Sequence, residues 1–239
     1  FLENQLSEPI CVNNFNPKII SEWITKRQRK YPIFNNAYMM TGTHHLYNYL
    51  PTKHEKWLTM IKQEIIDSGL IIDILNAKTM EAVFRLLQGC SFLGSFLAYQ
   101  YTIDMNYSPY INFSENDFVK AGIGAIRGIK KCFLCYGNKC EDAIWYVKEH
   151  FNDLLKRYGY TSFHPLPGHE PTLIDLQNCF CETDKYLRAK MPELRIGNVR
   201  IKQKYMPHTD PIQFFFPPKW NIVEMYKYKP IVVPTLFDL

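Results

Sequence analysis

The sequence lacks the features that define several classes of protein. No stretch approaches the roughly 20 consecutive apolar residues that cross a bilayer, because glycine, serine or glutamine interrupts the longest apolar segments, such as 92–101. Residues 1–8 carry two acids and no basic region, which is not the pattern of a signal peptide. Alternating strand patterns are nearly absent, and we find no internal repeat. We therefore expect an intracellular globular protein, nuclear in a eukaryote or in the host cytoplasm if viral.

Cysteine is too sparse for a disulfide framework. The chain has seven cysteines, an odd number, among 239 residues of which 46% are hydrophobic, enough for a sizeable core without disulfides. The spacing of Cys132, Cys135 and Cys140 allows zinc, but Cys179 and Cys181 do not form the usual second half of such a site. We expect reduced thiols, and we predict no metal and no cofactor.

Charge of neither sign dominates, but basic residues cluster. The net charge is +5, and the range 185–204 holds seven lysines or arginines against a single acid, Glu193. A second basic cluster occupies 26–30. Such clusters are usually solvated faces, although they also fit an anionic partner such as DNA.

Helical periodicity dominates the chain and predicts an all-α fold. Caps, glycines and prolines delimit helices at 16–32, 52–69, 79–89, 93–106, 114–121, 125–134, 140–158 and 171–190. Seven of the fifteen prolines follow residue 191. We predict a helical domain over 1–191 and an irregular extension over 192–239. The extension should pack on the helices, because it is rich in aromatic residues, among them Phe214, Phe215, Phe216, Trp220 and Tyr226.

Two glycines, Gly89 and Gly94, separate the helices expected at 79–89 and 93–106. This pattern predicts a helix-hairpin-helix, whose backbone N–H groups can approach a DNA phosphate. The alternative is a tight turn with a glycine cap. Gln100 and Asp104 follow on one face of the next helix, and a carboxylate in these apolar surroundings is a candidate general base or a helix-end cap.

A second glycine-rich turn, with Gly122 and Gly124, is followed by Arg127 and by the pair Lys130 and Lys131. We expect this turn to interrupt the helices and to bind phosphate or pyrophosphate, although it lacks the Gly-Lys-Ser/Thr ending of a P-loop. His44 and His45 are further candidates for lining a pocket or contacting phosphate, although adjacent histidines are more often surface or capping residues.

Four segments together carry a family resemblance. The run 92–100, then Asp104, then 122–128, and finally the Cys-Glu-x-x-Lys-Tyr-x-Arg pattern in 180–188 resemble the alpha-glutamyl/putrescinyl thymine pyrophosphorylases of phages. These segments span about 40% of the chain. One departure is Ile123, where the family commonly has proline.

The resemblance implies a DNA glycosylase-like helical fold that flips its target base. It implies DNA carrying pyrophosphorylated 5-hydroxymethyluracil, in which an amine or amino acid displaces pyrophosphate. Three cations would hold the departing group, namely Arg127, Lys185 and Arg188. Three acids are candidate bases or amine-holding carboxylates, namely Asp104, Glu182 and Asp184. Gln100 would bond the pyrimidine edge.

Three other functions stay open on sequence grounds. The scaffold could serve a non-catalytic reader of DNA or of modified bases, a DNA glycosylase, or a structural domain without affinity for DNA. A reader would depend on Lys130 and Lys131 and tolerate replacement of Asp104, whereas an enzyme would not. The sequence leaves the oligomeric state undetermined.

Overall fold

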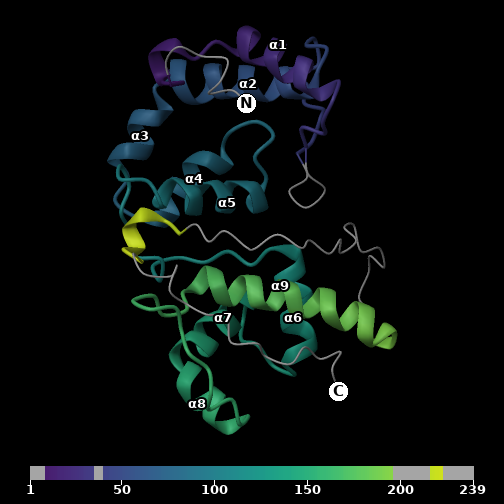
Figure 1. The fold of residues 1–239 in the computed structure, drawn as a ribbon, viewed down its shortest axis with the longest axis vertical. Coiled ribbons are helices and arrows are strands. Elements are labelled where there is room, and N and C mark those ends of the chain that lie inside the picture. Colours follow the sequence, from purple (N-terminus) through teal and green to yellow (C-terminus); the bar gives the residue numbers. More distant parts are fainter. Residues whose placement is uncertain (1–8, 35–39, 196–215, 223–239) are drawn as a thin grey trace.

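The computed structural model describes residues 9–34, 40–195 and 216–222, and within these ranges the chain forms helices and turns but no strand. The predicted all-α class is confirmed. Figure 1 shows α1 and α2 at one end of the molecule, α4 and α5 in the middle, and α6 to α9 at the other end. The helices are α1 (Pro17–Gln28), α2 (Lys53–Met60), α3 (Leu70–Asn76), α4 (Met80–Gln88), α5 (Ser95–Asn106), α6 (Ile123–Cys132), α7 (Cys140–Glu149), α8 (Phe151–Arg157) and α9 (Leu173–Lys190).

Side-chain caps fix the starts of three helices where the sequence predicts them. Asn16 accepts hydrogen bonds from the first turn of α1, with Pro17 at the first helical position. Thr52 accepts from the backbone N–H of Glu55, and Thr79 caps α4 in the same way. The described residues contain no helix long and apolar enough to span a membrane.

The predicted helix 52–69 changes type along its length. After α2 the chain continues through a π-helical segment, η3 (Ile61–Asp67), and ends at Gly69, whose φ of 81° is left-handed. Such a φ favours glycine because it has no Cβ. Helix α3 was not predicted, because it begins directly after Gly69 and no loop separates it from the preceding helix.

Three helix predictions are wrong in detail. The range 114–121 is not helical, because the Ser114 hydroxyl accepts from the N–H of Asn116 and forms a local turn instead. Gly124 does not interrupt a helix, since α6 begins at Ile123. No helix therefore lies directly before the second glycine-rich turn, and the predicted interruption of helices at this turn is wrong. The predicted helix 140–158 divides at His150 into α7 and α8.

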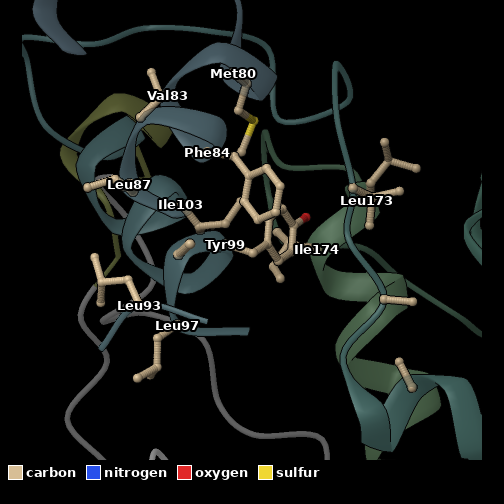
Figure 2. Close-up of a cluster of buried hydrophobic side chains, with 14 of the residues drawn as sticks. Met80, Val83, Phe84, Leu87, Leu93, Leu97, Tyr99, Ile103, Leu173 and Ile174 are labelled. Atoms are coloured by element: carbon tan, nitrogen blue, oxygen red, sulfur yellow. The ribbon is translucent and has the colours of Figure 1, made fainter. Parts of the chain in front are cut away.

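The core forms where α4 and α5 meet the first turn of α9 (Figure 2). Phe84 on α4 and Tyr99 on α5 are almost fully buried, and Leu173 of α9 is fully buried. Each such side chain stabilises the fold by about 1.5–3 kcal/mol through removal of apolar surface from water. The core therefore fixes α5, whose other face carries Gln100 and Asp104.

Two glycines allow α6 to lie directly against α9. A Cβ added to Gly128 would stand 2.0 Å from the backbone oxygen of Phe180. One added to Gly124 would stand 2.5 Å from the Cys181 sulfur. Close helix packing therefore accounts for both glycines.

The described part of the C-terminal extension, 216–222, contacts the helical body. Trp220 donates from its indole nitrogen to Glu115 at 2.8 Å and stacks on His169. Lys219 donates to the backbone oxygens of Asn106 and Phe113. Other aromatic residues predicted to pack here lie outside the described residues, namely Phe214, Phe215 and Tyr226. The proposed boundary at 191/192 stays a prediction.

Candidate functional site

A pocket of about 280 Å³ lies along one face of α5. Its α5 wall consists of Leu97, Gln100, Tyr101 and Asp104, which share a face because they are three or four residues apart. The opposite wall is the connection between α1 and α2, through Ile33, Phe34 and Met40. The pocket therefore has largely apolar walls and brings together Gln100 and Asp104, which the sequence analysis selected.

The Asp104 carboxylate has no hydrogen-bond or ion-pair partner within the described ranges, and neither has the Gln100 amide. Partial burial raises the pKa of Asp104, since an apolar wall disfavours its charged form. Burial, and then the charge of Asp104, raise the pKa of Tyr101. The pocket thus presents to a ligand one carboxylate and one amide that no other described residue binds.

The wall opposite α5 is held in place by contacts with α2. The indole nitrogen of Trp57 donates to the backbone oxygen of Thr41 at 2.8 Å, and the ammonium of Lys56 donates to that of Gly42 at 3.0 Å. The Lys53 ammonium lies 4.2 Å from the centre of the Phe34 ring, a cation–π contact. These contacts hold Phe34 and the residues that follow Met40 against α2.

The turn between α4 and α5 begins after Gly89 and ends at Gly94, as predicted. Both glycine N–H groups are already used, that of Gly89 by the carbonyls of α4 and that of Gly94 by the carbonyl of Phe92. The residue with left-handed backbone is Phe92, with φ 66°. Contact of this hairpin with phosphate stays a prediction, and it would have to use other N–H groups than those two.

The carboxylate of Glu64 on η3 joins this hairpin to the preceding helices. It accepts from the Tyr47 hydroxyl at 2.6 Å and from the Ser91 backbone N–H at 2.7 Å. Burial alone would raise the pKa of Glu64, but these hydrogen bonds outweigh it and lower the pKa below its usual value. The sequence analysis missed Glu64, because nothing in its local pattern distinguishes it from a solvated helical acid.

His44 and His45 lie beside the same hairpin. Their rings are 4.6 Å apart, and the ring of His44 is 5.2 Å from that of Phe92. The Nδ1 atom of His44 is buried and has no hydrogen-bond partner among the described residues. Phosphate binding by the two histidines stays a prediction.

The other predicted catalytic residues lie on α6 and α9, and none of them lines the α5 pocket. Asp184 is buried between Lys131, at 2.6 Å, and Arg188, at 3.1 Å. Only 3%, 1% and 9% of the side chains of Lys131, Asp184 and Arg188 are exposed. The pair of Lys131 and Asp184 joins α6 to α9, whereas that of Asp184 and Arg188 lies within α9. The predicted roles of the three residues in catalysis or DNA binding stay predictions.

The remaining charged residues of α6 and α9 are closer to the surface. Glu182 and Lys185 form an exposed ion pair with each other. Arg127 is half-buried and Lys130 is exposed. The predicted catalytic residues therefore form two separate groups in the fold. One group is Gln100 and Asp104 on α5, and the other is the charged residues of α6 and α9.

The cysteines form no cross-link, since all seven thiols are free. Cys132 and Cys135 are exposed, and Cys140 begins α7. Within the described residues no three histidines, cysteines or acids gather as metal ligands would.

The family model described as the helical domain of 5-hmdU DNA kinase matches residues 1–196. No curated protein and no solved structure was found to match the chain.

Proposed function

The chain belongs to the family of 5-hmdU DNA kinase helical domains, and from that premise we propose that it acts on 5-hydroxymethyldeoxyuridine in DNA through the α5 pocket. This family is related to thymine hypermodification, as the sequence resemblance implied, although it is described as a kinase family. Its partner would be DNA carrying a modified uracil. Such a partner implies an intracellular location.

One observation carries this proposal: a pocket with largely apolar walls on α5 contains an amide, Gln100, and an exposed carboxylate, Asp104, neither of which has a partner among the described residues. Its volume of about 280 Å³ suits one flipped pyrimidine base. A glutamine amide both donates and accepts, as the edge of a uracil does. The carboxylate of Asp104 can accept a hydrogen bond from the hydroxymethyl O–H, which thymine lacks.

The same carboxylate suits a reaction at the hydroxymethyl group. Asp104 would accept the hydroxyl proton while the oxygen forms its new bond to the phosphorus of the phosphoryl donor and the bond from that phosphorus to the donor's leaving oxygen breaks, so that the remainder of the donor departs. The raised pKa of Asp104 favours that proton transfer. The sequence has no Gly-Lys-Ser/Thr ending of a P-loop. We therefore propose that this domain presents the base and that the phosphoryl donor is held outside it.

A finer form of the proposal is the transferase that the sequence resemblance implied, in which an amine displaces pyrophosphate from the modified base. Asp104 would then deprotonate the amine instead of the hydroxyl. The cations that would receive pyrophosphate include Arg188, which is already bonded to Asp184. The kinase-related function is favoured, because only the α5 pocket carries an unpaired acid beside an unpaired amide among the predicted residues that the structure describes.

Binding to matched duplexes tests the proposal. We expect the protein to prefer a duplex with one 5-hydroxymethyldeoxyuridine over its thymidine counterpart by about 10–100-fold, since a hydrogen bond to a charged group contributes roughly 1.5–3 kcal/mol. Asp104→Leu should abolish that preference in fluorescence anisotropy. The control Asp73→Leu, at an exposed position on α3, should retain it. Equal affinity of the wild-type protein for both duplexes would exclude recognition of the modified base in this pocket.

A further inference from the structure

Two parts of the chain form the pocket, and their relative position sets its shape. One wall is the connection between α1 and α2, with Phe34 and Met40. The other is α5, whose first turn carries Leu97 and whose last turn carries Asp104. A base bound between these walls would contact both, so any contact that ties one part to the other also sets the width of the pocket.

The Glu64 carboxylate makes such a tie. One of its oxygens accepts from Tyr47, in the segment that precedes α2, and the other accepts from the backbone of Ser91, four residues before α5 begins. Tyr47 is 2% exposed, so its hydroxyl has little access to water as an alternative partner. Glu64 therefore binds both parts of the chain with a single carboxylate.

The surroundings of this tie depart from regular structure in two places. Glu64 lies on the π-helical segment η3 rather than on a regular α-helix, and such segments are frequent at functional sites. The neighbour of Ser91, Phe92, has a left-handed backbone, which is unfavourable for a residue other than glycine. The rings of Trp57 and Tyr47 pack on Phe92 at 5.2 and 5.4 Å and hold it in this conformation.

We propose that Glu64 is a positioning residue for base recognition: its bonds to Tyr47 and Ser91 fix α5 against the α1–α2 connection, so that Gln100 and Asp104 meet the base. This inference rests on the function proposed above. Glu64 does not line the pocket, so it acts through the hairpin and not by contact with the base. Its replacement should change selectivity for the modified base and not merely the stability of the fold.

Glu64→Gln is the sharpest variant, because the amide keeps the shape of the side chain but turns one acceptor into a donor facing Tyr47 or Ser91. The control is Asp67→Asn, on the same π-helical segment, where Asp67 makes only an exposed ion pair with Lys62. The affinity of each folded, full-length variant is measured for the duplex with 5-hydroxymethyldeoxyuridine and for its thymidine counterpart. The fraction of protein that binds DNA is determined by titration. The salt dependence of affinity is recorded in parallel.

We expect Glu64→Gln to lower the preference for 5-hydroxymethyldeoxyuridine about tenfold while the salt dependence stays unchanged, because phosphate contacts are not altered. Asp67→Asn should keep the full preference. Hydrogen exchange of the backbone amides in 88–101 should accelerate in Glu64→Gln but not in the control.

The possible failures are distinguishable. Suppose that the wild-type protein prefers the modified base and that Asp104→Leu removes this preference. If Glu64→Gln then retains the preference, the positioning role of Glu64 is wrong and the proposed function stands. If the wild-type protein shows no preference between the two duplexes, the proposed function and the positioning role of Glu64 are both overturned. A loss of thermal stability in Glu64→Gln with unchanged preference would also overturn the proposal, because it would show a purely structural role.

Discussion

At the scale of single residues, the glycines where α6 crosses α9 are compatible with two roles, ligand binding and close helix packing. From the sequence, Gly122 and Gly124 are expected to form an anion-binding turn. In the structure Gly124 faces Cys181 across the helix contact, and Gly128 meets the backbone of Phe180. Glycine can serve close backbone approach to a ligand or to another helix, and the sequence alone does not distinguish the two.

The glycines lead to a stability prediction. Gly128→Ala should destabilise the protein by more than about 3 kcal/mol, because its Cβ would overlap a backbone oxygen that cannot move without shifting α9. Gly94→Ala should cost about 1 kcal/mol or less, since nothing lies within 4 Å of the added Cβ and φ is −70°. Urea unfolding of both variants checks this. Equal losses would mean that α6 and α9 are not in the contact described.

At the scale of elements, ordinary capping rules predicted most of the helices, whereas tertiary contacts decided the exceptions. Thr52 and Thr79 mark helix starts because their caps are local. The segment around Ser114 forms a local turn, and the bond between Glu115 and Trp220, more than a hundred residues away, holds that segment in place. Glu64 was missed for the same reason, since its partners lie 17 and 27 residues away.

The Glu64 tie predicts a pH dependence of stability. The folded-state pKa of Glu64 is lowered, so its contribution is complete above the ordinary glutamate pKa of about 4.3 and is lost as pH falls through the folded value. At pH 7, Glu64→Gln should lower the free energy of unfolding by about 1.5–3 kcal/mol. Chemical unfolding of both proteins from pH 7 to pH 3 should show the difference shrinking only below about pH 4.3. A difference that stays constant over this range would contradict an ionised Glu64.

At the scale of the whole molecule, the sequence predicted the fold class and half of the pocket but not the pocket itself. Gln100 and Asp104 share a face of one helix, and this follows from their spacing. Phe34 and Met40 come from a connection more than 50 residues earlier, and no local pattern places them opposite α5. The charged residues of α9 stood out equally in sequence, although Asp184 and Arg188 are buried in ion pairs.

The most direct test of the central claim is photo-cross-linking with DNA in which 5-iododeoxyuridine replaces the modified base, followed by mass spectrometry of the attached peptide. The iodine occupies the position of the hydroxymethyl carbon, so the cross-link marks the side chain closest to the reacting group. We predict attachment within the pocket, at Phe34 or Tyr101, and its loss when excess DNA with 5-hydroxymethyldeoxyuridine competes. Attachment at 180–188 on α9 would contradict the account and would instead favour the site that the sequence resemblance implied.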